Sequence, residues 1–126
     1  MVLTNAPVIA FLATTDAARA RRFYEGSLGL LLREDSPFAL VFEAAGTSLR
    51  IQKVEHLTPQ PFTALGFSVP DIQRAIEALI QHGVRFERYG FLEQDALGVW
   101  TAPGGAKVAW FKDPDGNTLS LTAAPI

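Results

Sequence analysis

The stretch WFKDPDGNTLSLT, from Trp110 to Thr122, decides the fold of this chain. Its two ends are rich in aromatic and β-branched residues, and its centre is the sequence DPDGN at Asp113–Asn117. Proline followed closely by glycine favours a tight turn between two strands. The stretch therefore predicts an antiparallel hairpin. A second turn, APGG at Ala102–Gly105, predicts that a further strand comes before that hairpin.

The same opening occurs twice in the chain. VIAFLATTD (Val8–Asp16) is a β-rich run that ends in Asp, and ALGFSVPD (Ala64–Asp71) repeats the pattern. An Asp at this place is a good helix N-cap, because its carboxylate accepts hydrogen bonds from the first free backbone N–H groups. We therefore expect two similar modules, about residues 7–54 and 62–122, within a single domain that spans residues 1–126. Residues 55–61 read as a linker.

A helix is expected after each Asp. In the second module apolar residues recur at helical spacing, at Ile72, Ala75, Ile76, Leu79 and Ile80. A weaker stripe in the first module consists of Ala20, Phe23, Tyr24, Ser27 and Leu28. Gly83 and Gly29 follow these stripes, and glycine suits the left-handed position after a last helical turn.

Strands are expected after both helices. The pattern predicts strands at residues 30–34, 38–44 and 47–54 in the first module, and at 84–89, 97–101, 106–112 and 118–122 in the second. A turn near Ala45-Gly46 would join the last two strands of the first module. The plan of each module is strand, helix, then three strands, and the fold class is α+β.

Composition narrows the function classes. The chain has 126 residues, 48% of them hydrophobic and 19% charged, with a net charge of −2 and no cysteine. The proportions of hydrophobic and charged residues are typical of a globular protein. The lack of cysteine excludes disulfides, thiolate metal sites and cysteine nucleophiles. The weak net charge argues against a nucleic-acid partner, and the basic run at Arg19, Arg21 and Arg22 has no aromatic stacking platform beside it.

Location follows from the same features. The apolar run APVIAFLA (Ala6–Ala13) has no basic residue before it, so we expect a buried strand and not an export signal. No apolar run is long enough to span a membrane. We expect a cytoplasmic protein.

The order of elements and several short motifs resemble the vicinal oxygen chelate superfamily, which includes glyoxalase I, extradiol dioxygenases, fosfomycin-resistance enzymes and bleomycin-resistance proteins. The motifs that carry the resemblance are Asp16, RRFYEGSLGL (Arg21–Leu30), SVPDIQRAI (Ser68–Ile76), the Gly83-Val84 helix exit and FKDPDGNTLSL (Phe111–Leu121). The resemblance implies paired βαβββ modules whose mixed sheet curls around a cup, often in a dimer. We therefore expect a homodimer.

The resemblance also implies where a metal would be held. Relatives that use a metal place one ligand on the first and one on the last strand of each module, which here gives Ile9, Ala64, Arg50 and Ser120, with Gln52 as the neighbour of Arg50. None of these offers the carboxylate or imidazole donor that a divalent site needs. His82 is expected in the last turn of a helix and His56 in the linker. We predict no metal and no cofactor.

Strand alternation predicts which side chains line the cup. We expect six ligand-binding residues there: Phe11, Arg50, Gln52, Trp100, Trp110 and Ser120. Trp110 could stack on a flat ligand, and Arg50 could pair with a carboxylate or phosphate. The alternatives are a core or interface aromatic for Trp110, and for Arg50 an ion pair with Glu43 or a solvated edge.

Three acidic residues are candidates for a general base. Glu93 and Asp95 lie in the loop FLEQDALGVW (Phe91–Trp100), which could form a flap that includes Trp100, and Glu43 lies on a predicted strand. The alternative is an ordinary surface loop.

These features favour one function and leave two others open. The leading expectation is metal-independent binding of a small organic ligand, aromatic or anionic, in the cup. The alternatives are a metal-dependent enzyme like glyoxalase or the dioxygenases, and a metal-free acid/base catalyst.

Overall fold

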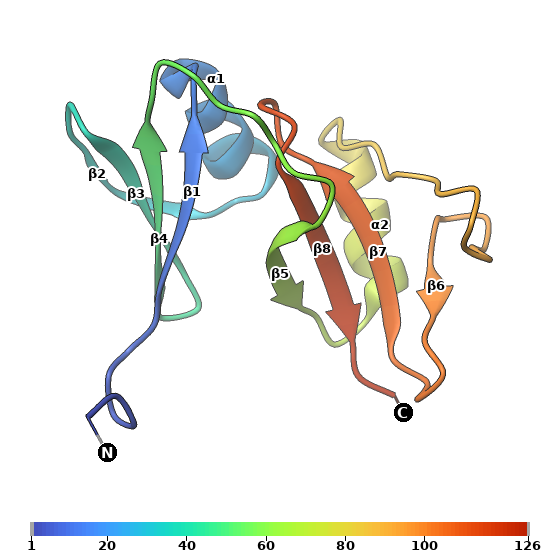
Figure 1. Ribbon diagram of the computed structural model, residues 1–126. Helices are drawn as coiled ribbons and strands as arrows, with labels where there is room; N and C mark the ends of the chain where they lie inside the picture. Colours follow the sequence, from blue (N-terminus) through green and yellow to red (C-terminus); the bar gives the residue numbers. More distant parts are fainter. Residues whose placement is uncertain (1, 126) are drawn as a thin grey trace. The chain divides into compact units, whose positions relative to one another are not determined.

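The computed structural model describes residues 2–125, which form two compact units, Met1–Thr58 and Pro59–Ile126 (Figure 1). The division falls inside the expected linker. No helix among the described residues is long and apolar enough to cross a membrane. Each unit contains one four-stranded mixed sheet, so the α+β class is confirmed.

The first unit has the order strand, helix and three strands. Its elements are β1 (Ile9–Thr14), α1 (Ala17–Arg21), η1 (Arg22–Ser27), β2 (Leu31–Asp35), β3 (Ala39–Ala44) and β4 (Thr47–Lys53). The sheet order is β1-β4-β3-β2, with β1 parallel to β4 and the other pairs antiparallel. Ala45 and Gly46, with φ of 48° and 85°, make the tight turn between β3 and β4.

Strand alternation separates the two faces of the first sheet as expected. Leu40, Phe42, Leu49 and Ile51 are buried. The Tyr24 ring from η1 packs on this face, 5.8 Å from the Phe42 ring. Phe11, Arg50 and Gln52 lie on the opposite face and are exposed. The expectation of a buried first strand is therefore only half right, because Leu12 is buried while Phe11 keeps 53% of its surface exposed.

The first helix departs from a regular α-helix. Asp16 caps its start as predicted, accepting a hydrogen bond from Arg19 N at 3.1 Å. From Arg22 onward the backbone widens into a π-helix, in which Leu28 N donates to Phe23 O at 2.9 Å. Ala20 of α1 and Tyr24 of η1 are buried, and Gly29, at φ 75°, follows the end of η1.

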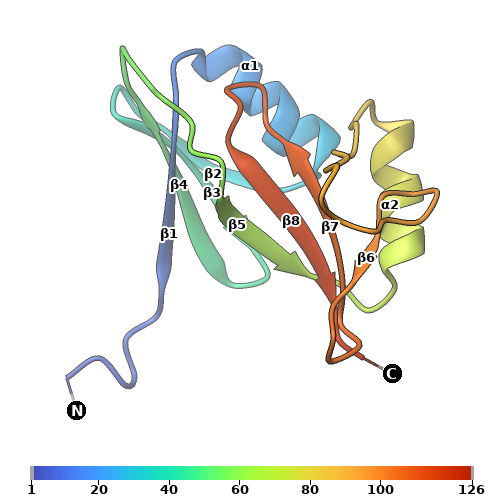
Figure 2. The same cartoon turned by 45° about the vertical axis from the view of Figure 1, so that its right-hand side comes forward.

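The second unit repeats the plan with different proportions. Its elements are β5 (Thr63–Ser68), α2 (Ile72–Gln81), β6 (Trp100–Thr101), β7 (Lys107–Lys112) and β8 (Thr118–Ala123). The sheet order is β5-β8-β7-β6, with β5 parallel to β8. Helix α2 covers one face of this sheet (Figure 2). That face holds the buried residues Ala109, Phe111, Leu119 and Leu121, and α2 contributes Ile72 and Ile76.

The turn quoted at the start is held together by Asp113. Its Oδ1 accepts hydrogen bonds from Asp115 N at 3.0 Å and Asn117 N at 2.9 Å. Its Oδ2 accepts from Asn117 Nδ2 at 2.8 Å, and Gly116 takes φ 92° between them. Asp113 is only 5% exposed. Its carboxylate therefore accepts the hydrogen bonds that water would accept in an exposed turn, and without it the N–H groups of the turn would lack acceptors.

Two of the strands predicted in the second module differ from the structure: one is absent, and the other is shorter than expected. Residues 84–89 form no strand and contribute only the isolated bridge between Phe86 and Phe111. The strand expected at 97–101 is reduced to Trp100–Thr101. The physical reason is the side chain of Gln94, which takes the Glu87 carbonyl and the Tyr89 N–H that a strand would have used for pairing.

Candidate functional site

Four aromatic rings of the second unit form a continuous surface, which we call the aromatic cluster: Tyr89, Phe91, Trp100 and Trp110. The Tyr89 ring centroid lies 5.6 Å from that of Phe91 and 5.6 Å from that of Trp110, and the Trp100 and Trp110 centroids are 6.1 Å apart. Phe91 is 82% exposed, and the other three rings are partly exposed. An exposed group of large rings of this kind is uncommon on a monomer surface, which makes it a candidate binding site.

The sheet register puts both tryptophans on one face. Trp110 on β7 lies opposite Ser120 on β8, and Trp100 on β6 lies opposite Val108, two residues before Trp110. This is the face away from α2, because residues of a strand alternate between faces and Phe111 is buried on the helix side. Trp110 Nε1 donates to Thr63 Oγ1 at 3.1 Å, so the indole is fixed in orientation.

Close packing beneath Trp110 requires a glycine on β5. Gly66 pairs with Ser120, and a Cβ placed on Gly66 would lie 2.9 Å from Ser120 Oγ. Ser120 itself is only 5% exposed. Of the ligand-binding residues predicted in this unit, the two tryptophans are therefore more accessible than Ser120.

The loop that carries Tyr89 and Phe91 is organised by Gln94. Its Oε1 accepts from Tyr89 N at 2.8 Å, and its Nε2 donates to Glu87 O at 3.0 Å and to Gly98 O at 2.8 Å. One amide thus ties both ends of the loop together and holds Tyr89 against Trp110. Sequence reasoning missed this residue, since no local pattern indicates which backbone groups a glutamine will reach.

Asp95 has a structural task in the same loop. Its Oδ1 accepts from Leu97 N and from Val99 N, both at 2.9 Å, and closes the turn before β6. Asp followed three residues later by a glycine at φ 90°, Gly98, is a turn signal that the sequence does contain. Asp95 therefore acts as a turn cap, and its carboxylate is only partly available for chemistry.

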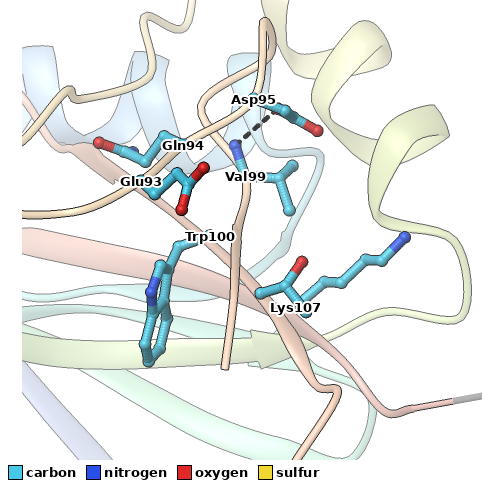
Figure 3. Close-up of a pocket in the computed structure, with 7 residues that line it drawn as sticks. Glu93, Gln94, Asp95, Val99, Trp100 and Lys107 are labelled. Atoms are coloured by element: carbon cyan, nitrogen blue, oxygen red, sulfur yellow. Dashed lines mark hydrogen bonds between the residues drawn. The ribbon is translucent and has the colours of Figure 1, made fainter. Parts of the chain in front are cut away.

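A hollow of about 360 Å³ lies at the β6 edge of the sheet (Figure 3). Its lining residues are Glu93, Gln94, Asp95, Val99, Trp100, Thr101 and Lys107. Glu93 is exposed and makes no ion pair or hydrogen bond with any other residue in the described range 2–125. The structure therefore brings the predicted residues Glu93, Asp95 and Trp100 together around one hollow.

Tyr89 has a perturbed acidity. Partial burial raises the pKa of the Tyr89 phenol above its ordinary value, and the nearby negative charge of Glu87 raises it further. The phenol consequently stays protonated across the physiological pH range. It is available as a neutral hydrogen-bond donor at the edge of the aromatic cluster.

The other predicted ligand-binding residues lie on the exposed face of the first sheet. Arg50 on β4 is flanked by Phe11 on β1 and Val41 on β3, and Gln52 lies two residues further along β4. The alternative that Arg50 pairs with Glu43 is wrong. Glu43 Oε1 instead accepts from Arg33 Nε at 3.0 Å and Nη2 at 2.8 Å. Arg50 has no ion-pair partner among residues 2–125.

The residues do not fit the metal site that the resemblance implies. Arg50 lies beside Phe11 on the first strand of its unit, and Ser120 lies beside Gly66 on β5, so a shift in register from Ile9 or Ala64 adds no donor. Residues 2–125 contain no group of three or more His, Asp or Glu side chains that could hold an ion. His82 instead closes α2, with its ring nitrogen 3.0 Å from Ala78 O.

Solved structures share this fold over almost the entire chain. A member of the glyoxalase/bleomycin resistance protein/dioxygenase superfamily from Sphaerobacter thermophilus has a TM-score of 0.75 at 23% identity, covering 96% of this chain and 98% of that one. A lactoylglutathione lyase from Agrobacterium tumefaciens has a TM-score of 0.72 at 15% identity, covering 94% and 93%. A related protein from Nocardioides has a TM-score of 0.70 at 22% identity, covering 99% and 88%.

At these identities the likeness shows the fold and not the activity. No curated protein matches the sequence significantly. The family model of the Glyoxalase/Bleomycin resistance protein/Dioxygenase superfamily matches residues 6–121. The chain belongs to that superfamily.

Proposed function

We propose that the protein binds a flat organic ligand on the aromatic cluster, by ring stacking and hydrogen bonding. The observation that carries this proposal is the set of ring contacts that joins Tyr89, Phe91, Trp100 and Trp110 into one accessible surface. The recognition does not call on a metal, since the side chains at the four family positions offer no suitable donors.

Stacking on the aromatic cluster favours a ligand that carries a flat ring system. Each aromatic pair contributes about 0.5–1.5 kcal/mol beyond the effect of burying its area. Trp100 and Trp110 supply the stacking surface, and the loop residue Phe91 can add an edge contact. The protonated Tyr89 phenol offers a directional donor, which gives the site a means of choosing among flat molecules.

We also propose a separate anion contact at Arg50, on the exposed face of the first sheet. Its guanidinium is exposed and unpaired among the described residues, so it can bind a carboxylate or phosphate without first breaking an ion pair. Gln52 and Phe11 lie on the same face and would add a polar and an apolar contact. We keep the homodimer and the cytoplasmic location as proposals that accompany this function.

Acid/base catalysis without a metal is a second candidate function, and one observation bears on it. Of the three candidate bases, Glu43 is paired with Arg33 and Asp95 caps a turn, whereas Glu93 is exposed and uncommitted. Glu93 is therefore the base that such an enzyme would use. An activity that survives chelation and is lost in Glu93→Gln would favour catalysis over binding alone.

The chain offers a matched pair of variants for the binding test. Phe91 is 82% exposed in the aromatic cluster, and Phe38 is 79% exposed in the first unit. Neither ring is part of a core, so Phe91→Ala and Phe38→Ala should both fold normally. With 1-naphthylmethanol as the probe, we expect Phe91→Ala to weaken binding about fivefold, the value of one aromatic contact. Phe38→Ala should bind like the parent protein. Equal affinities in the two variants, or no binding at all, would contradict the proposed function.

A further inference from the structure

The hollow at the β6 edge differs in chemistry from the tryptophan surface that it adjoins. Trp100 belongs to both, so a ligand stacked on the tryptophans can extend a substituent into the hollow. At that point the substituent meets Glu93, whose carboxylate has no counter-ion among residues 2–125. An unpaired carboxylate next to a large aromatic ring is the usual environment for an organic cation.

The geometry of the hollow separates its charges. Trp100 and Thr101 are consecutive residues of β6, so their side chains point to opposite faces, and Lys107 pairs with Thr101. Figure 3 shows Glu93 on the Trp100 side of the backbone at Val99, while the Lys107 side chain extends away on the other side. The ammonium of Lys107 therefore does not neutralise Glu93.

Two further cations of the second unit have partners of their own, and Arg88 keeps its positive charge because its partner is a backbone carbonyl. Arg88 Nη2 donates to Ala96 O at 2.6 Å, and Lys112 Nζ lies 3.8 Å from Glu87 Oε1. Asp95 also lines the hollow, but its carboxylate lies on the Lys107 side of Val99 (Figure 3), so Glu93 is the carboxylate next to Trp100. Among the described residues that line the hollow, Lys107 is the one cation, and it extends to the side away from Trp100. An anionic substituent would therefore face Glu93, whereas a cationic one would find both a carboxylate and an indole face.

We propose that the site takes an aromatic amine: its ring stacks on Trp100 and Trp110, and its ammonium group lies between the Glu93 carboxylate and the Trp100 ring. This inference rests on the proposed function and names the ligand class for the same site. Tryptophan is the aromatic residue that best attracts a cation, and loss of solvent around the bound ammonium strengthens that attraction.

Three probes of one shape test the charge preference. They are 1-naphthylmethylammonium, 1-naphthylmethanol and 1-naphthylacetate, and binding is followed by NMR titration of the whole chain. We expect the ammonium to bind about fivefold tighter than the alcohol, because one cation–π contact and one exposed ion pair each add a modest contribution. The carboxylate should bind most weakly.

Two matched variants assign the preference to one carboxylate. Glu93→Gln removes the charge and keeps the length of the side chain, and we expect the ammonium preference to fall from about fivefold to about twofold, because only the cation–π contact with Trp100 remains. Glu77→Gln changes the net charge by the same amount at an exposed position of α2 and should keep the fivefold preference. The melting temperatures of both variants should match the parent, since neither glutamate side chain makes a hydrogen bond or ion pair within residues 2–125.

The outcomes separate the two proposals. If all three probes bind alike, if the acetate binds best, or if the ammonium preference in Glu93→Gln is as large as in the parent protein, the cationic ligand class is wrong and the aromatic site stands. If none of the probes binds up to millimolar concentration, the aromatic site and the ligand class fail together.

Discussion

The outward faces of the two sheets differ although the strands beneath them follow the same plan. In the first unit, β4 carries a row of polar residues on its outward face: Ser48, Arg50 and Gln52. In the second unit β7 and β6 present Trp110, Val108 and Trp100, a predominantly aromatic row. The buried faces are alike, since both consist of apolar residues packed under a helix. The comparison shows that the repeat conserves the core pattern and leaves the outward positions free to carry function.

The turns of the two units also differ, and the second depends more on side chains. Ala45 and Gly46 close the β3–β4 turn with backbone conformation alone, whereas Asp113 organises the β7–β8 turn with its carboxylate. The second unit likewise uses Gln94 and Asp95 to shape its long loop. Substitutions of polar residues should therefore cost more stability in the second unit than in the first.

The largest effect is expected for Asp113→Ala. The change leaves the N–H groups of Asp115 and Asn117 without their acceptor in a buried turn, so the free energy of unfolding should fall by about 3 kcal/mol. Urea denaturation measures this. Asp113→Asn keeps one acceptor oxygen and should lose less. Equal losses in the two variants would contradict the role of the carboxylate.

Gln94→Ala should have the next largest effect, about 2 kcal/mol, because three backbone groups lose their partner. The loss should also be visible as faster amide hydrogen exchange at Tyr89. The matched control in the first unit is Gln52→Ala, whose side chain is exposed and should change stability by less than about 0.5 kcal/mol. If Gln94→Ala were as stable as Gln52→Ala, the claim that polar side chains contribute more stability in the second unit would be wrong.

Gly66→Ala should cost about 1–2 kcal/mol, since the new methyl group would meet Ser120 Oγ at 2.9 Å. The double variant with Ser120→Ala should recover part of this loss in thermal unfolding, because the clashing oxygen is gone. In the first unit, Phe11 on β1 lies beside Arg50 as Gly66 lies beside Ser120. Phe11 is exposed, so Phe11→Ala should change the free energy of unfolding only slightly. If the double variant recovered no stability, the contact with Ser120 Oγ would not be the cause of the loss in Gly66→Ala.

The smallest effect is a gain. Ala45 has φ 48°, a conformation that glycine adopts without the steric cost of a Cβ. Ala45→Gly should therefore raise the free energy of unfolding by about 0.5–1 kcal/mol, as the relief of strain exceeds the added freedom of the unfolded chain. Thermal unfolding checks the sign. A loss of stability would mean that the turn does not adopt this conformation in solution.

Sequence patterns predicted those parts of the structure that local chemistry determines. The Asp caps at Asp16 and Asp71 and the opposite placement of Phe111 and Trp110 follow from capping and from the period of a strand. The departures have a common cause in side chains that reach across the chain. The Gln94 side chain bonds the Glu87 carbonyl, which strand pairing would otherwise use. Glu43 pairs with Arg33 and not with Arg50. Neither contact is visible in a local sequence pattern.

The most direct test of the aromatic cluster uses the fact that the chain has two tryptophans, both in that cluster. A ¹H–¹⁵N NMR spectrum should show two indole N–H signals, which Trp100→Phe and Trp110→Phe assign individually. On addition of 1-naphthylmethanol we predict that both indole signals shift together with the Tyr89 and Phe91 amides, with a single dissociation constant. Shifts confined to other residues, with both indole signals unchanged, would contradict the central claim.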